Sequence, residues 1–225
     1  MLPKTVDDLS SVPLFTGFDE YLLNIVKRAT AIQHYEVGEI IFLQGEPCTN
    51  LYIVQEGWLK GVITSLAGRE QIIRLLGPGD IFNEISLFTD GKNRVTVQAL
   101  EESTLWFIER ETMLRLMDDH PRLCRVITRN MAESVLHLTK LVEDLSLRTV
   151  KSRMARILLE NAAEGVINRR RWMTQTEMAA RLGTVLDVAN RIMTGLENEG
   201  LISVARYKIR ILNPTGLEAL AVLEE

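Results

Sequence analysis

The spacing of apolar residues along the chain changes twice. Between residues 18 and 30 apolar side chains recur at intervals of three and four, which predicts an amphipathic helix. From residue 33 to residue 107 short β-branched and aromatic runs alternate with glycines, the pattern of strands joined by tight turns. Beyond this stretch the spacing is again helical over most of the chain. The pattern therefore predicts a compact antiparallel roll or barrel preceded and followed by helices.

A long helix is predicted to begin at Asp119-His120-Pro121, because proline is tolerated in a first helical turn and an acid favours the helix N-terminus. Within it, residues at intervals of three and four form an a/d pattern sustained over about three heptads. The predicted dimer-interface residues are Cys124, Ile127, Met131, Ser134, Leu138, Leu141 and Leu145. The same stripe could instead pack on the chain's own roll. Because apolar neighbours such as Val135 and Val142 widen the stripe, we expect both contacts, with the seam to a second subunit favoured.

A helix-turn-helix is predicted in the last third of the chain. The segment Thr174–Glu177 is a capping box, in which the threonine oxygen accepts from the backbone N–H three residues on. Gly183 follows at the spacing of a tight turn between two crossing helices. Another amphipathic helix is predicted over residues 147–161, and alternation over residues 201–211 predicts a β-ribbon. A generic helical hairpin is the alternative, but the ribbon and the basic loop 168–171 favour a winged helix-turn-helix.

Thr184 is predicted to cap the recognition helix, with Val185 and Ala189 on its inner face. Side chains on the outer face carry the groups that base edges require: Arg191 for guanine, Asn190 for adenine, Asp187 for cytosine and Leu186 for a thymine methyl. The predicted DNA-binding residues are Thr174, Gln175, Leu186, Asp187, Asn190, Arg191 and Arg206. Asp187 could instead complete the cap or pair with Arg191 four residues on.

Composition and charge fit this organisation. The chain has 225 residues, 46% of them hydrophobic, and a formal charge of -4, which suits two globular domains of modest size or one large one. Residues 147–217 carry +6, whereas the first 146 residues carry -7 and the last eight carry -3. The positive charge that phosphate binding requires is therefore concentrated on the predicted helix-turn-helix. The acidic remainder is no objection, because exposed charges beyond a Debye length of ~8–10 Å are mostly screened.

Several classes of protein are disfavoured. No apolar run reaches the ~18–20 residues that span a bilayer, and residues 1–8 lack the apolar stretch of a signal peptide, so we expect a cytoplasmic protein without a membrane partner. Cys48 and Cys124 have no CxxC spacing, which disfavours an iron–sulfur cluster or a structural zinc site. The histidines are scattered, which gives haem little support. Without a catalytic triad or a glycine-rich phosphate loop, an enzyme is not expected.

The order of these parts resembles the cyclic-AMP receptor / fumarate-and-nitrate-reduction regulator (Crp/Fnr) superfamily of bacterial transcription factors, over nearly the whole chain. The segments that carry the resemblance are Gly38–Glu46, Leu51–Gly57, Gly77–Phe82 and Leu196–Ile202. The family implies a homodimer that binds double-stranded DNA at a palindromic operator, and contact with RNA polymerase if the protein is an activator. It also implies an effector in the roll that changes the affinity for the operator.

The resemblance implies an α+β fold with an N-terminal double-stranded β-roll, cupin-like and of the cyclic-nucleotide-binding type. The effector-sensing roll and its flanking helices are expected in residues 1–118, the dimerisation helix in 119–146 and the winged helix-turn-helix in 147–225. A ligand-binding module that acts through protein contacts, without specific DNA binding, is the alternative function. The positive charge of residues 147–217 and the capped helix pair favour the DNA-binding regulator.

The family's effector site corresponds to residues 83–95. Glu84 matches the ribose-hydroxyl acceptor and Arg94 the phosphate-pairing arginine, at the family's spacing. Asn83 replaces a glycine and Val95 a hydroxyl residue, which counts against a cyclic nucleotide, whereas an anionic ligand remains a candidate. Glu84 and Arg94 could instead pair with each other as a structural bridge. Of two matched long-helix positions only Thr139 keeps a hydroxyl, and the predicted effector-binding residues are Asn83, Glu84, Ile85, Arg94, Val95, Leu138 and Thr139.

Overall fold

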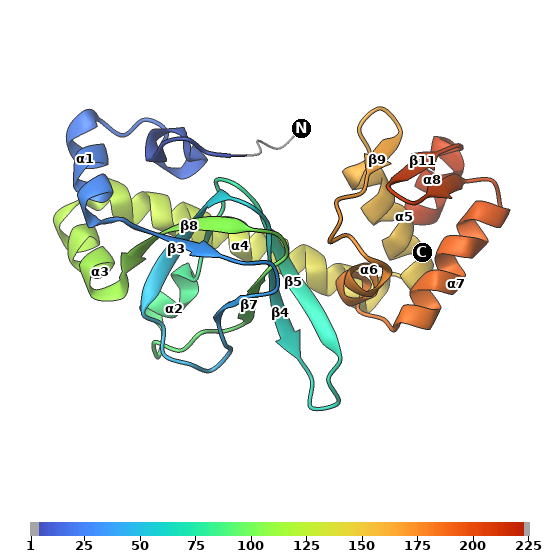
Figure 1. The fold of residues 1–225 in the computed structure, drawn as a ribbon, viewed down its shortest axis with the longest axis horizontal. Helices are drawn as coiled ribbons and strands as arrows, with labels where there is room; N and C mark the ends of the chain where they lie inside the picture. Colours follow the sequence, from blue (N-terminus) through green and yellow to red (C-terminus); the bar gives the residue numbers. More distant parts are fainter. Residues whose placement is uncertain (1–4, 223–225) are drawn as a thin grey trace. The chain divides into compact units, whose positions relative to one another are not determined.

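The computed structural model describes residues 5–222, and Figure 1 shows its fold. Residues 1–4, which form part of the start used above to argue against a signal peptide, lie outside the described residues, as do residues 223–225. The described chain divides into two compact units, one made of residues up to 63 with 73–137, the other of residues 64–72 with 138–222. No helix within residues 5–222 is long and apolar enough to cross a membrane.

The chain enters the first unit through short helices. These are the 3-10 helices η1 (Leu9–Ser11) and η2 (Pro13–Phe15), followed by α1 (Glu20–Ala29). Asp19 caps α1, because its carboxylate accepts a hydrogen bond from the Leu22 backbone N–H at 2.9 Å. The helix predicted between residues 18 and 30 is therefore confirmed, whereas neither 3-10 helix was predicted.

The strands between residues 31 and 109 form two four-stranded sheets, with the orders β1-β8-β3-β6 and β2-β7-β4-β5. Most neighbours in these sheets are distant in the sequence, which makes the fold a roll and confirms the predicted architecture. The strands are β1 (Ala31–Tyr35), β2 (Ile40–Phe42), β3 (Asn50–Glu56), β4 (Leu59–Thr64), β5 (Glu70–Leu76), β6 (Ile81–Phe82), β7 (Thr96–Ala99) and β8 (Ser103–Glu109).

Aromatic side chains fill one part of the roll's interior. The rings of Tyr52 and Phe82 stack with their centroids 5.2 Å apart, and Phe42 lies 5.6 Å from Tyr52. A second core joins the strands to the helices α2 (Glu84–Phe88) and α3 (Arg110–Asp119). The short helix α2 was not predicted, because five residues are too few to show a helical period.

The long helix α4 (Pro121–Leu147) begins at the predicted start and runs without interruption. Its buried face consists of Leu123, Ile127, Asn130 and Ser134. Ile127 and Ser134, both predicted in the dimer interface, are thus covered by their own chain and cannot belong to a face that is free for a second subunit. The two compact units divide inside α4, between His137 and Leu138, which is earlier in the sequence than the predicted boundary at residue 147.

The second unit contains the predicted helices and ribbon, together with two elements that were not predicted. Helices α5 (Val150–Asn161), α6 (Gln175–Leu182) and α7 (Leu186–Asn198) are followed by strands β10 (Ile202–Ala205) and β11 (Lys208–Ile211). The additional elements are β9 (Val166–Asn168), which completes a three-stranded sheet of order β10-β11-β9, and α8 (Pro214–Ala221).

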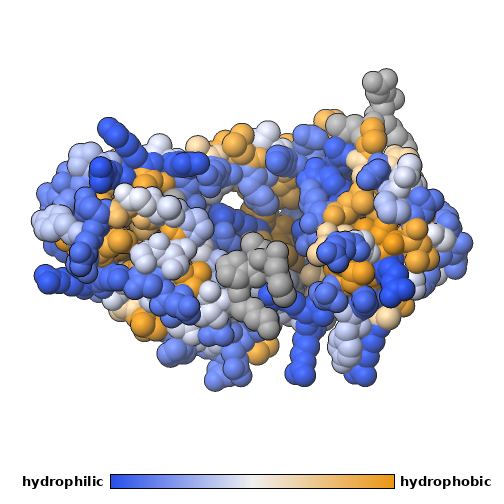
Figure 2. Space-filling view, turned by 90° about the horizontal axis from the view of Figure 1, so that it is seen from above, coloured by the Kyte–Doolittle hydropathy of each residue, from blue (hydrophilic) through white to orange (hydrophobic). Residues whose placement is uncertain are grey.

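These elements enclose one apolar core. Met154 and Leu158 of α5, Leu196 of α7, Ile209 of β11 and Leu217 of α8 are buried together. On the face shown in Figure 2, hydrophilic side chains predominate and apolar ones gather in separate patches. Because the burial of apolar side chains stabilises a folded domain, the buried residues of α5 contribute to the stability of this unit.

Truncation of Leu158 tests this core. Leu158→Ala should lower the free energy of unfolding by ~2–5 kcal/mol, because Leu158 is fully buried and its loss leaves a cavity. Leu212→Ala is the matched control, since Leu212 is 53% exposed and its truncation should cost less than about 1 kcal/mol. Urea denaturation measures both values, and equal losses would contradict the assignment of Leu158 to the core.

Candidate nucleic-acid interface

The turn between α6 and α7 requires a glycine. Gly183 has a φ of 67°, in the left-handed region, and its N–H bonds the carbonyl of Ala179. A Cβ at this position would lie 2.5 Å from Gln71 Oε1 and 2.8 Å from Leu145 Cδ2. At the other end of α6, the Thr174 hydroxyl accepts from the Glu177 N–H at 3.2 Å, as the capping box predicts.

The start of α7 differs from the prediction. Val185, not Thr184, is the N-cap, and no side chain caps the first turn. Thr184 instead closes the end of α6, because its N–H bonds the carbonyl of Ala179 at 3.0 Å. The predicted cap at Thr184 is therefore wrong. Val185 was predicted on the inner face but is 52% exposed.

The outer face of α7 presents unpaired charges. Ala189 and Leu196 are buried, while Leu186, Asp187 and Arg191 are exposed. No ion pair joins Asp187 to Arg191, although the two are four residues apart and both lie in the described chain, so the structural alternative for this pair is not observed. An exposed guanidinium without an intramolecular partner is free to bind a guanine edge.

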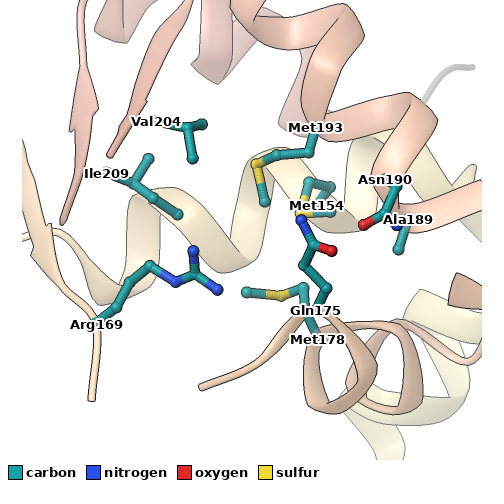
Figure 3. Close-up of a pocket in the computed structure, with 9 residues that line it drawn as sticks. All are labelled: Met154, Arg169, Gln175, Met178, Ala189, Asn190, Met193, Val204 and Ile209. Atoms are coloured by element: carbon teal, nitrogen blue, oxygen red, sulfur yellow. The ribbon is translucent and has the colours of Figure 1, made fainter. Parts of the chain in front are cut away.

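Asn190 and Gln175 line a small cavity beside this face. Figure 3 shows Met154, Met178 and Met193 converging on it, with Arg169 at one side. Its volume is about 20 Å³, room for a group of about the size of one water molecule, so it does not suit an effector. Asn190 is half-buried at its edge, whereas Gln175 is exposed.

The basic loop and the ribbon are tied together. The Arg169 N–H donates to the carbonyl of Tyr207 at 2.9 Å, and the Arg206 guanidinium lies 5.1 Å from the centroid of the Tyr207 ring. Within residues 5–222, Arg171, Lys208 and Arg210 form no ion pairs and are exposed. The second unit therefore combines an exposed helix with a positively charged ribbon and loop, the arrangement that phosphate and groove binding require.

Asn83, at the start of the predicted effector segment 83–95, is held by hydrogen bonds within the roll. Asn83 has a φ of 71°, a conformation that asparagine tolerates better than most residues, so the backbone keeps a shape otherwise suited to glycine. Its side-chain amide donates to Asn93 Oδ1 at 3.0 Å and to the carbonyl of Asn50 at 3.1 Å. It also donates to Cys48 Sγ at 3.3 Å. Burial raises the pKa of the Cys48 thiol, which favours its neutral form.

Glu84 and Arg94 face different partners. Glu84 is buried and accepts a hydrogen bond from the Ser134 hydroxyl of α4 at 2.8 Å. Arg94 is exposed and pairs with Asp90 at 2.5 Å. The alternative considered for this pair, a structural bridge between Glu84 and Arg94, is therefore not observed. Ser134 was not predicted as a partner of Glu84, although a hydroxyl on the apolar face of a long helix is a signal for a buried polar contact.

The remaining predicted effector residues are Ile85 and Val95 of the same segment, and Leu138 and Thr139 of α4. Ile85 and Val95 are half-buried, and Leu138 and Thr139 are exposed on the part of α4 that belongs to the other unit. A cyclic nucleotide needs a cation at its phosphate and an accessible acceptor at its ribose. Because Arg94 is paired with Asp90 and Glu84 accepts from Ser134, a cyclic nucleotide would have to compete with both of these contacts.

Known proteins share both units. Residues 32–120 match the cyclic nucleotide-binding domain family, and residues 152–220 match the Crp-like helix-turn-helix domain family. The cyclic AMP receptor protein of Thermus thermophilus is 28% identical over 93% of this chain and 96% of its own length. The transcriptional activator protein Anr of Pseudomonas aeruginosa is 29% identical over 98% of this chain and 87% of its own length.

A solved structure supports the same grouping. A transcriptional regulator of the Crp/Fnr family from Thermus thermophilus superposes with a TM-score of 0.69 and 26% identity, covering 85% of this chain and 98% of its own. A nucleotide-binding-type roll, a long helix and a helix-turn-helix define a DNA-binding transcription regulator. The chain belongs to the Crp/Fnr superfamily.

Arg191→Ala tests the outer face of α7. The substitution should weaken binding to a specific operator by ~1–3 kcal/mol and relax the preference at one base pair, because it removes a bidentate contact to guanine. Binding to randomised duplexes, followed by sequencing of the bound fraction, measures both effects. Arg115→Ala, at an exposed arginine of α3, is the control and should change neither. An unchanged base preference would refute the role of Arg191.

Proposed function

We propose that the protein is a dimeric, sequence-specific transcriptional regulator whose two recognition helices bind the half-sites of a palindromic operator. The observation that carries this proposal is that Arg191 and Asp187 on the outer face of α7 are exposed and form no ion pair with any residue in the range 5–222. The net charge of +6 on residues 147–217 and the exposed cations of the ribbon support it. A module that acts only through protein contacts has no use for this distribution of charge.

Salt dependence separates these two functions. For DNA from upstream of the protein's own gene, log K of binding should fall linearly with the logarithm of the salt concentration. Each phosphate neutralised should contribute a fall of about 0.9 in log K for a tenfold rise in salt. Fluorescence anisotropy with that duplex and with a scrambled duplex of equal length measures both the slope and the sequence preference. A protein that shows no preference and no slope is not a DNA-binding regulator.

The proposed dimer uses the exposed face of α4. With Ile127 and Ser134 buried, the exposed and half-exposed residues that still follow heptad spacing are Cys124, Thr128, Met131, Val135, Leu138, Val142 and Leu145. This seam keeps the predicted residues Cys124, Met131, Leu138 and Leu145 and replaces Ile127, Ser134 and Leu141 by their neighbours. Val135 and Val142 are 60% and 62% exposed, and a second copy would cover both.

Two glutamate substitutions test the seam. Leu138→Glu should raise the dimer dissociation constant on the order of 100-fold or more, because an unpaired buried charge costs ~3–5 kcal/mol. Leu136→Glu introduces the same charge two residues earlier, at a 64% exposed position outside the seam, and should leave the dimer intact. Sedimentation velocity over a range of concentrations distinguishes them. A Leu138→Glu protein that remains dimeric would contradict this interface.

We also propose that cyclic AMP is not the effector, since Arg94 and Glu84 are directed to Asp90 and Ser134. A ligand at 100 times its dissociation constant stabilises the folded protein by ~2.7 kcal/mol. Cyclic AMP should therefore leave the melting temperature and the operator affinity unchanged. A rise in melting temperature that saturates with cyclic AMP, and that disappears in Arg94→Ala, would overturn this part of the proposal.

A further inference from the structure

The last turn of α4 carries charges of the unfavourable sign. Glu143 and Asp144 lie near the C-terminus of the helix, where the helix dipole disfavours an acid. The side chain of Asp144 is only 15% exposed. Burial raises the pKa of Asp144, while the positive charges of the facing Arg156 and Arg148 lower it and so favour the carboxylate.

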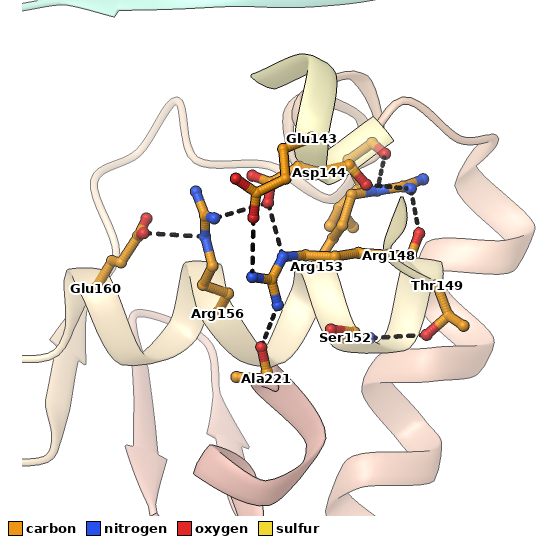
Figure 4. Close-up of polar contacts among 10 residues, drawn as sticks. Glu143, Asp144, Arg148, Thr149, Ser152, Arg153, Arg156, Glu160 and Ala221 are labelled. Carbon is orange, nitrogen blue, oxygen red and sulfur yellow. Dashed lines mark hydrogen bonds and ion pairs between the residues drawn. The ribbon is translucent and has the colours of Figure 1, made fainter. Parts of the chain in front are cut away.

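Arginines of the following segment surround this turn, as Figure 4 shows. Asp144 Oδ1 lies 2.7 Å from Arg156 Nη1 and 3.0 Å from Arg148 Nε. Arg148 also pairs with Glu143 at 3.3 Å and donates to the carbonyl of Ala221 in α8. Arg156 extends the cluster to Glu160 at 3.1 Å. The cluster therefore joins the end of α4 to both α5 and α8.

Arg153 caps two helices with one guanidinium. Its Nη1 donates to the carbonyls of Asp144 and Arg148, at 3.1 Å and 2.8 Å, where α4 ends. Its Nε donates at 3.0 Å to the carbonyl of Leu182, the last residue of α6. The last carbonyls of a helix lack N–H partners further along the helix, and Arg153 binds such groups at two helix ends. The Asp144 carbonyl also accepts from the Arg148 N–H at 3.2 Å. Leu145 of α4 lies beside Gly183, because a Cβ added at Gly183 would be 2.8 Å from Leu145 Cδ2.

This arrangement links the proposed seam to the recognition helix. Leu138, Val142 and Leu145 of the seam belong to the same compact unit as α6 and α7. Arg153 binds the carbonyl of Leu182, the last residue of α6, and Leu145 lies beside Gly183, the next residue. Both contacts are therefore made shortly before α7 begins. A fixed direction of α7 relative to the seam would then fix the spacing of two recognition helices in a dimer, which must match half-sites about 34–36 Å apart.

We propose that Asp144 and Arg153 are positioning residues that set the spacing of the two recognition helices, and so allow one dimer to bind both half-sites of an operator at once. This inference rests on the proposed dimeric DNA-binding function. It assigns Asp144 and Arg153 no contact with DNA. Their effect should appear only when two half-sites are bound together, because each helix-turn-helix keeps its own outer face.

The test compares a duplex with both half-sites to a duplex with one, using the operator selected from the protein's upstream DNA. Simultaneous binding typically increases affinity by ~10²–10⁴-fold over a single site. The quantity compared is the ratio of the affinity for the two-site duplex to the affinity for the one-site duplex. Asp144→Asn and Arg153→Gln should reduce this ratio by about tenfold or more, while the affinity for the one-site duplex stays within about twofold of the wild-type value. Inserting one base pair between the half-sites should lower the affinity of the wild type for the two-site duplex by a larger factor than that of either variant.

Glu160→Gln is the matched control, because it neutralises a carboxylate of the same cluster that is 51% exposed and lies on α5. It should keep the wild-type ratio. If Arg153→Gln does not fold, Asp144→Asn, which preserves the shape of the side chain, supplies the same measurement. An unchanged ratio, an equal loss of half-site and full-site affinity, or loss of the dimer in sedimentation would each overturn the inference. Failure of the proposed function is distinct, since the wild type would then show no sequence preference.

Discussion

The period of the α-helix is the constraint on which the arrangement of α4 depends. A side chain on a helix faces one direction, so residues that pack on the roll are not available elsewhere. Leu123, Ile127, Asn130 and Ser134 occupy the roll side, and the hydrogen bond from Ser134 to Glu84 fixes that orientation with a buried polar contact. The neighbouring positions, among them Val135 and Val142, are exposed as a consequence. The orientation of α4 about its axis therefore determines both which side chains pack on the roll and which surface a second copy could contact.

The sequence predicted the architecture well because glycines and β-branched runs mark most strands of the roll, and because the Thr174 cap and Gly183 mark the ends of α6. It could not show whether Ile127 or Thr128, and Ser134 or Val135, belong to the exposed stripe that we propose as the dimer seam. Two stripes displaced by one residue both have intervals of three and four in a helix this rich in apolar residues, and only packing against the roll separates them. Thr184 was misassigned for a similar local reason: its N–H closes α6, which moves the start of α7 by one residue.

The cassette between Asn83 and Val95 shows where matching by position stops being informative. Asn83 has the positive φ that a glycine at this position would adopt readily, and its amide donates hydrogen bonds to Asn93, Asn50 and Cys48. Arg94 lies at the family's spacing from Glu84 but pairs with Asp90. The spacing of two charged residues limits which contacts they can make, whereas their neighbours determine which contacts form. The short helix α2, too brief to leave a periodic pattern, is what places Glu84 in the interior.

The third strand of the small sheet, β9, has a consequence for the thermodynamics of binding. It runs directly into the basic loop, and the bond from the Arg169 N–H to the carbonyl of Tyr207 holds that loop against the tip of the ribbon. The conformational entropy of these segments is therefore lost when the domain folds rather than when it meets a ligand. Binding to a polyanion is then accompanied mainly by the release of counterions and water. The enthalpy and entropy of binding therefore reflect the contacts at the interface and not the ordering of a loop.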